Sequence, residues 1–122
     1  MSESSTILVC DDEELIRWSL REYLEAEGYS VVEARDGVEC LERVASDAPD
    51  LLVVDLKMPR MGGMQVLQQL STDGSDLPVI VITAHGAIDL ALQATRLGAG
   101  AYLSKPFDLR EVGLAIRQVL KA

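Results

Sequence analysis

One stretch of the chain decides the expected fold: residues 51–63 have the sequence LLVVDLKMPRMGG. Its first four residues are apolar and do not alternate with polar ones, which is typical of a strand covered by helices on both faces of a parallel sheet. Asp55 ends this apolar run, and Gly62-Gly63 marks a turn before a segment with helical spacing of apolar residues. The stretch therefore predicts a buried strand, a polar turn and a helix.

The same unit recurs along the rest of the chain. Further apolar runs lie at residues 7–10, 31–32, 79–82 and 101–103, and each reads as a short strand. A helical apolar face follows every strand: Ile16, Leu20, Tyr23 and Leu24; Val38, Leu41, Val44 and Ala45; Met64, Leu67 and Leu70; Ala87, Leu90, Ala91, Ala94 and Leu97; Leu109, Val112, Ile116 and Val119. Asp108 and Glu111 have the spacing of a capping box and should start the last helix.

Five strands alternating with five helices predict an α/β fold of the (βα)5 type. We expect an open, doubly wound, flavodoxin-like sheet of five parallel strands, and its order, 2-1-3-4-5, is taken from known sheets of this kind. The 122 residues suffice for one domain and are too few for two, so residues 1–122 are expected to form a single unit.

Composition excludes several classes of function. A net charge of -9 without a basic cluster argues against direct nucleic-acid contact. The chain has no apolar run long enough for a membrane span and no signal peptide, so a cytoplasmic location is expected. Cys10 and Cys40 lie in apolar stretches without metal-ligand spacing, and both are expected to be reduced and buried.

Polar side chains follow four of the five predicted strands. They are Asp11 and Asp12 after the first strand, Asp55 after the third, Thr83 after the fourth and Lys105 after the fifth. Because ligands bind beyond the carboxyl ends of parallel strands, we expect these side chains to converge on one pocket. Each also has an ordinary interpretation: the first acids could cap a helix, and the others could be turn or strand-end residues.

Crowded carboxylates repel one another, and without a cation one of them would tend to take up a proton. Oxygen ligands without imidazole or thiolate favour a hard ion, which predicts Mg²⁺, for which Mn²⁺ could substitute. An aspartate nucleophile, such a metal, a lysine and a hydroxyl are a sufficient set for phosphoryl transfer. The nucleophile would be Asp55, assisted by Lys105 and Thr83.

Four motifs carry a resemblance to a known family. They are VCDDEE at 9–14, LLVVDLKMPRMGG at 51–63, VITAHG at 81–86 and GAYLSKPF at 100–107. With this order and spacing, the sequence resembles the receiver domain of bacterial two-component response regulators over essentially its whole length. The resemblance implies a regulatory phosphoacceptor rather than a stand-alone enzyme, and one that promotes its own phosphotransfer and dephosphorylation.

The resemblance also implies a role for each site residue. Asp55 would be the phosphoacceptor and a metal ligand, together with Asp12 and the main-chain carbonyl of Lys57. Asp11 would contribute to the metal site through water. The donor of the phosphoryl group would be a sensor histidine kinase.

Thr83 and Lys105 would contact the phosphoryl oxygens, and the Lys105-Pro106 peptide is expected to be cis. Phosphorylation should draw Thr83 inward and open space for Tyr102, which could alternatively be a core or strand-edge tyrosine. The output surface implied by the resemblance comprises the fourth helix, the fifth strand and the fifth helix. There Ile88 and Leu92 could form a homodimer contact, or be two scattered exposed aliphatic residues.

Residues 81–109 further resemble receivers attached to sigma-54-dependent, NtrC-like AAA+ transcriptional activators. On this interpretation residues 1–122 are the amino-terminal fragment of a longer regulator, whose output domain comprises an AAA+ ATPase and a DNA-binding part. The alternative is a stand-alone single-domain regulator in a phosphorelay.

Two rival functions come from other classes. Mg²⁺-dependent phosphohydrolases with an aspartate nucleophile usually carry an Asp-x-Asp pair after their first strand, whereas Asp11 and Asp12 are adjacent here. A flavin-binding module needs a neutral or basic phosphate loop, and the loop after the first strand is acidic. Both rivals fit the sequence less well than a receiver does.

Overall fold

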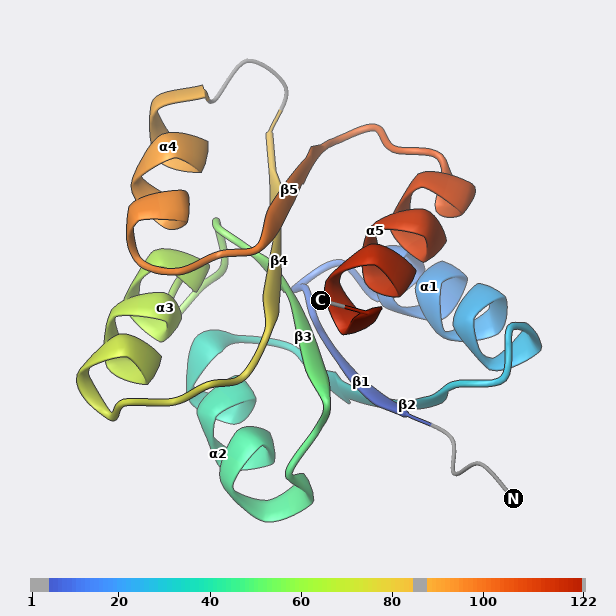
Figure 1. The fold of residues 1–122 in the computed structure, drawn as a ribbon, viewed down its shortest axis with the longest axis horizontal. Helices are drawn as coiled ribbons and strands as arrows, with labels where there is room; N and C mark the ends of the chain where they lie inside the picture. Colours follow the sequence, from blue (N-terminus) through green and yellow to red (C-terminus); the bar gives the residue numbers. More distant parts are fainter. Residues whose placement is uncertain (1–4, 85–87, 122) are drawn as a thin grey trace.

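The computed structural model describes residues 5–84 and 88–121, in which five strands alternate with five helices (Figure 1). The strands are β1 (Thr6–Cys10), β2 (Ser30–Ala34), β3 (Leu51–Asp55), β4 (Val79–Thr83) and β5 (Ala101–Ser104). The helices are α1 (Glu14–Ala26), α2 (Gly37–Asp47), α3 (Gly63–Thr72), α4 (Ile88–Arg96) and α5 (Leu109–Lys121). Every predicted element is present, and the strands extend one or two residues beyond the predicted apolar runs.

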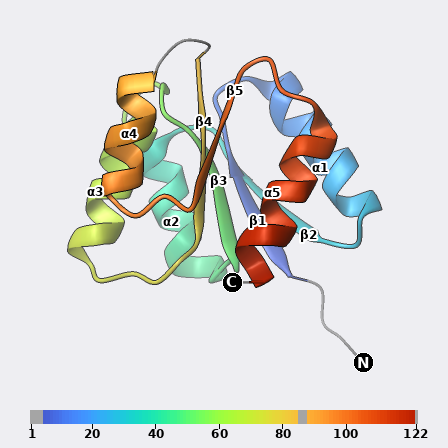
Figure 2. The same ribbon diagram turned by 45° about the horizontal axis from the view of Figure 1, so that its top comes forward.

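The strands form one parallel sheet in the order β2-β1-β3-β4-β5, which confirms the predicted flavodoxin-like topology. Figure 2 shows the sheet between two layers of helices, with α1 and α5 on one face and α2, α3 and α4 on the other. Crossovers on both faces of one sheet are what a doubly wound fold requires.

The central strands bury side chains on both of their faces. Successive residues of a strand point to opposite faces. In β3, Leu51 and Val53 pack in the cluster beneath α1 and α5, whereas Leu52 and Val54 pack beneath α2, α3 and α4. Every residue of β3 and β4 is buried, which explains why neither strand alternates in hydrophobicity.

The predicted helix faces pack on the sheet, with one correction in α2. Ala45 was expected on the buried face but is exposed. Cys40 is fully buried instead, with Leu41 and Val44 packed against the same cluster, so Ala45 lies beyond the edge of the apolar stripe. Cys10 and Cys40 are reduced and buried, as predicted. Ala87, which was predicted on the buried face of the fourth helix, lies outside the described residues.

The capping box predicted at the start of α5 is formed in part, because the Asp108 carboxylate contacts the Arg110 amide instead of the Glu111 amide. The Asp108 carboxylate accepts a hydrogen bond from the Arg110 amide at 2.8 Å, and the Asp108 amide donates to the Glu111 carboxylate at 3.0 Å. These bonds satisfy backbone amides that a helix amino terminus otherwise leaves without partners. They also position the segment that links β5 to α5.

The loop after β3 packs so closely that three glycine positions, Gly37, Gly62 and Gly63, have no room for a side chain. A Cβ atom on Gly63 would lie 2.4 Å from the main-chain oxygen of Asp55, and one on Gly37 would lie 2.4 Å from that of Met61. The backbone of Asp55 is therefore pressed directly against the start of α3. Among the described residues, none of the helices has the length and apolar character needed to cross a membrane.

Gly63→Ala tests this close packing. Alanine in a helix normally stabilises relative to glycine by roughly 0.5–1 kcal/mol. At this position we expect the opposite sign, a loss of about 1–3 kcal/mol in the free energy of unfolding measured with urea, because the new methyl group overlaps the Asp55 carbonyl. Gly100→Ala is the control, since its Cβ would meet ordinary contacts of 3.6 Å. Equal stability changes in the two variants would contradict the packing argument.

Candidate functional site

Of the polar residues predicted to converge, Asp11, Asp12, Asp55 and Lys105 meet beyond the carboxyl ends of the strands, and Thr83 borders them through its backbone carbonyl. Asp11 follows β1, Asp55 ends β3, Thr83 ends β4 and Lys105 follows β5. The Lys105 ammonium nitrogen lies 2.9 Å from Asp55 Oδ2 and 3.2 Å from Asp11 Oδ2. Residues separated by as many as 94 positions in the chain thus form one charged cluster.

Four carboxylates gather at this edge. Asp11, Asp12, Glu13 and Asp55 each contribute an oxygen to a group in which all the ligand atoms lie within 4.8 Å of one another. Asp11 is fully buried, whereas Asp12 and Glu13 are exposed. An arrangement of carboxylate oxygens without nitrogen or sulfur suits a hard divalent cation such as Mg²⁺.

Asp11 provides independent support for a cation site. Its Oδ1 atom accepts a hydrogen bond from the Glu13 amide at 2.9 Å, a local turn contact just before α1 rather than a cap on a helix amide. Its buried Oδ2 atom has no hydrogen-bond partner within the described residues. Burial raises the pKa of Asp11, the charge of Asp55 adds to this effect, and the hydrogen bond from Glu13 opposes it. A cation would compensate the buried charge that causes this shift.

Asp55 is held in a defined orientation. Its side chain is almost completely buried, Oδ1 accepts a hydrogen bond from the Lys57 amide at 3.1 Å, and Oδ2 accepts one from Lys105. The Lys57 backbone therefore borders the site, and a ligand role for its carbonyl remains a prediction. Both carboxylate oxygens face polar groups at the open edge of the sheet.

Lys105 is surrounded by negative charge. Its ammonium also donates a hydrogen bond to Glu13 Oε1 at 2.9 Å. Burial acts to lower the pKa of Lys105, but the hydrogen bonds to Glu13 and Asp55 and the charge of Asp11 outweigh it and raise the pKa. Lys105 is consequently a cation at neutral pH. The Lys105-Pro106 peptide is cis, as predicted.

Thr83 and Tyr102 occupy neighbouring strands near the site. Thr83 is buried, its hydroxyl donates to the Ala84 carbonyl at 3.3 Å, and its own carbonyl accepts from the Lys105 amide at 2.9 Å. Tyr102 lies on the edge strand β5 and is 50% exposed. The alternative of a core tyrosine is therefore excluded, and the side chain is open to solvent.

Two residues at the site were not predicted to act there. Glu13 belongs to the VCDDEE motif without a predicted role of its own, yet it contacts Lys105. Arg17 is buried, and its guanidinium donates to the Asp11 carbonyl at 2.7 Å and to Glu33 Oε1 at 3.1 Å. An arginine inside an amphipathic helix carries no sequence signal for such a contact, because its partners come from β2 and from the loop after β1.

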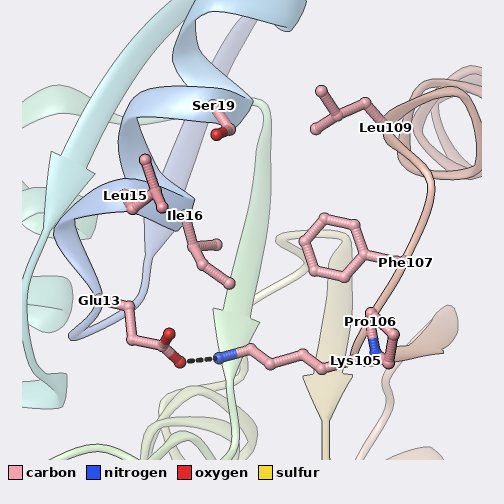
Figure 3. Close-up of a pocket in the computed structure, with 8 residues that line it drawn as sticks. All are labelled: Glu13, Leu15, Ile16, Ser19, Lys105, Pro106, Phe107 and Leu109. Atoms are coloured by element: carbon pink, nitrogen blue, oxygen red, sulfur yellow. Dashed lines mark hydrogen bonds and ion pairs between the residues drawn. The ribbon is translucent and has the colours of Figure 1, made fainter.

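An apolar groove begins at the Glu13–Lys105 pair. It has a volume of about 490 Å³ and lies between the first half of α1 and the segment that joins β5 to α5. Figure 3 shows Leu15 and Ile16 on one side of it and Phe107 on the other. Leu15 is 71% exposed, so the groove has an apolar rim directly beside the charged cluster.

The second apolar surface predicted on α4 is described in part. Leu92 is 52% exposed, in keeping with a position away from the sheet. The side chain of Ile88 lies outside the described residues, as do His85 and Gly86 of the VITAHG motif. A homodimer contact through this surface stays a prediction.

Known proteins match this chain throughout its length. The family model for the response regulator receiver domain matches residues 7–117. Response regulator MprA of Mycobacterium bovis (strain BCG / Pasteur 1173P2) is 46% identical over 118 residues, covering 97% of this chain and 51% of that protein. The chain thus spans about half the length of the curated relatives it matches.

Solved structures agree with the sequence match. A response regulator receiver domain protein from Clostridium thermocellum superimposes with a TM-score of 0.89 at 32% identity, covering 96% of this chain and 94% of that one. The receiver domain of NtrX from Brucella abortus gives a TM-score of 0.90 at 32% identity, covering 95% and 98%. These relatives support a receiver domain and do not support the narrower prediction of a sigma-54 AAA+ context.

Arg17→Ala tests the unpredicted support beneath the acidic cluster. The change leaves the Asp11 carbonyl without its buried donor and leaves Glu33 paired with Arg21 alone, so we expect a loss of about 2 kcal/mol in the free energy of unfolding. Arg35→Ala is the control, because Arg35 is 73% exposed and makes only a surface pair with Glu39; it should cost less than about 0.5 kcal/mol. Urea denaturation of both variants measures the difference, and similar losses would show that the Arg17 contacts add no stability.

Proposed function

The chain belongs to the response regulator receiver domain family, and we propose that Asp55 is its phosphoacceptor in a phosphorylation-dependent switch of a two-component system. The observation that carries the proposal is the contact of the Lys105 ammonium with Asp55 Oδ2 at 2.9 Å, beside a buried Asp11 oxygen that lacks a hydrogen bond. The proposed nucleophile Asp55, the ammonium of Lys105 and the Asp11 oxygen that could face a metal lie together at the open edge of the sheet.

In the proposed reaction, a carboxylate oxygen of Asp55 attacks the phosphorus atom of the donor. A new O–P bond forms while the bond from phosphorus to the donor nitrogen or oxygen breaks, and the leaving group departs on the opposite side. Lys105 supplies positive charge to the phosphoryl oxygens, and the Thr83 hydroxyl can donate to one of them. The contact between Lys105 and Asp55, present without a donor, supports this role for the lysine.

We propose Mg²⁺ as the metal that the acidic cluster takes, with Asp12, Asp55 and the Lys57 carbonyl as ligands and Asp11 acting through water. When bound, the metal neutralises charge on the carboxylates and on the transferring phosphoryl group. Two unit charges at 4 Å repel by about 4 kcal/mol at an effective dielectric of about 20, so an anionic nucleophile needs this compensation to attack an anionic donor. Mn²⁺, also a hard ion, could substitute.

The switch is proposed to run from Thr83 to Tyr102. A phosphoryl group adds about -1.5 to -2 charges and three acceptor oxygens, which would draw the Thr83 hydroxyl away from its contact with Ala84. Tyr102, two positions before the β5 partner of Thr83, would then exchange its solvent-exposed position for the space left behind. The altered surface comprises α4, β5 and α5.

We infer a sensor histidine kinase as the donor and an output domain as the recipient of the signal. What supports an output domain is the relatives' length, about twice that of this chain. A stand-alone phosphorelay regulator is the alternative, and a sigma-54 AAA+ output domain stays a prediction without support from the relatives. Any contact with DNA is assigned to the output domain, because the charge of -9 opposes it here.

Asp55→Asn tests the phosphoacceptor. Intact mass after incubation with Mg²⁺ and acetyl phosphate should show one added phosphoryl group, stable in acid and labile in base, on the wild-type chain and none on the variant. Asp76→Asn, an exposed aspartate remote from the cluster in sequence, is the control and should be modified normally. A wild-type chain that forms no adduct and binds no beryllofluoride would rule the proposal out.

Thr83→Ala tests the switch. The variant retains Asp55 and Lys105, so it should still accept the phosphoryl group, but the loss of the hydroxyl should weaken the response of α4 and β5. Ser104→Ala, at the exposed β5 position paired with Thr83, is the control. Amide chemical shifts with and without beryllofluoride report the response, and full-size shifts in the Thr83 variant would contradict the proposed route.

A further inference from the structure

Glu13 shares the ammonium of Lys105 with Asp55. Glu13 Oε1 and Asp55 Oδ2 each accept a hydrogen bond from Lys105 Nζ at 2.9 Å. Figure 3 shows Glu13 and Lys105 pointing toward each other from the start of α1 and from the segment after β5. Asp11 Oδ2, at 3.2 Å, is paired with the ammonium by charge but lacks a hydrogen bond. Glu13 is therefore one of two hydrogen-bonded anchors of this lysine.

The Glu13 carboxylate has no other task within the described part of the chain. Glu13 is the N-cap residue of α1, but its side chain makes no capping hydrogen bond. Asp11 accepts a hydrogen bond from the Glu13 amide, but that bond involves the backbone of Glu13 and leaves its carboxylate free to contact Lys105. A purely helix-capping role is thus excluded, and the contact with Lys105 accounts for the placement of the side chain.

A second anchor matters because lysine is flexible. Its charged group sits on a four-carbon stem and can reach many positions. With Asp55 as the only hydrogen-bonded partner, the ammonium could turn about that contact. Two partners on different elements fix it between the loop after β1 and the end of β3, beside the atom that would be phosphorylated.

Glu13 also belongs to the group of four carboxylates that could hold the metal. Four carboxylates and one ammonium leave three formal negative charges, and Glu13 contributes one of the four. We propose that Glu13 is a positioning residue that holds Lys105 beside Asp55 and adds to the charge that attracts the divalent cation. This inference rests on the proposed function and deepens it.

Glu13 further links the site to the apolar groove. Glu13 and Lys105 both line the groove, and the Glu13 side chain is 58% exposed. The same contact that positions the lysine is thus open to influence from outside.

The experiment separates the charge of Glu13 from its hydrogen bond. Glu13→Gln removes the charge but keeps an oxygen that can accept from Lys105, whereas Glu13→Ala removes both. Glu14→Gln and Glu14→Ala are matched controls, because Glu14 is exposed and makes no ion pair or hydrogen bond that the described residues show. Calorimetric titration of the full chain measures Mg²⁺ affinity, and intact mass measures phosphorylation by phosphoramidate at saturating Mg²⁺.

Both Glu13 variants should bind Mg²⁺ roughly threefold to tenfold more weakly than their Glu14 counterparts. This loss of affinity is at or below the low end of the range for residues that support metal ligands, because solvent and salt screen the charge of the exposed Glu13. At saturating Mg²⁺, Glu13→Ala should be phosphorylated roughly threefold to tenfold more slowly than Glu14→Ala, whereas Glu13→Gln should match Glu14→Gln. A structural defect alone would not produce this split between glutamine and alanine.

Equal Mg²⁺ affinities and equal rates in the Glu13 and Glu14 variants would overturn the inference, provided that the wild-type chain is phosphorylated. A wild-type chain that is not phosphorylated would instead overturn the proposed function. Urea unfolding of each variant shows whether a slower phosphorylation is caused by a lower stability. If the phosphorylation rate of Glu13→Ala falls only in proportion to its folded fraction, that result would also contradict the positioning role.

Discussion

The positive charge of Lys105 makes the acidic edge of this sheet compatible with folding. Asp11 and Asp55 are almost completely buried, and burying carboxylates without a partner is costly. Lys105 contacts both and brings in Glu13 as well. One ammonium cannot balance four carboxylates, and Asp11 Oδ2 remains without a hydrogen bond within the described residues. The resting edge is thus held together, yet it keeps a net negative charge that a further cation would compensate, and that residual charge is the basis of the proposed chemistry.

The parallel sheet supplies the rigidity that this edge needs. β1, β3 and β4 are adjacent, and their apolar residues fill both faces of the core, so the strand ends are fixed relative to one another. The connecting loops are held just as closely. Gly63 packs against the Asp55 carbonyl, and Arg17 donates to the Asp11 carbonyl. The backbone contacts and the apolar core therefore hold the charged groups in position, rather than the attraction between the charges themselves.

The site lies between the apolar groove and the strands of the proposed switch. On one side, the Glu13–Lys105 pair opens directly onto the groove beside Leu15 and Phe107. On the other side, the Lys105 amide donates a hydrogen bond to the Thr83 carbonyl at the end of β4. β4 in turn pairs with β5, which carries the half-exposed Tyr102. Lys105 therefore borders both the groove and the strands that are proposed to respond to phosphorylation.

The sequence by itself determined the alternation of strands and helices and the convergence of Asp11, Asp55, Thr83 and Lys105. Local patterns carry this information, because uninterrupted apolar runs mark buried parallel strands and the residues after them must meet at one edge. Strand order came only by analogy with known sheets. The tertiary structure decided which atoms touch. It placed the Glu13 carboxylate on Lys105, buried Arg17 against the Asp11 carbonyl, and put Cys40 rather than Ala45 on the buried face of α2. Those contacts join residues far apart in the chain or depend on the phase of a helix, and their distances and burial exist only once the chain has packed.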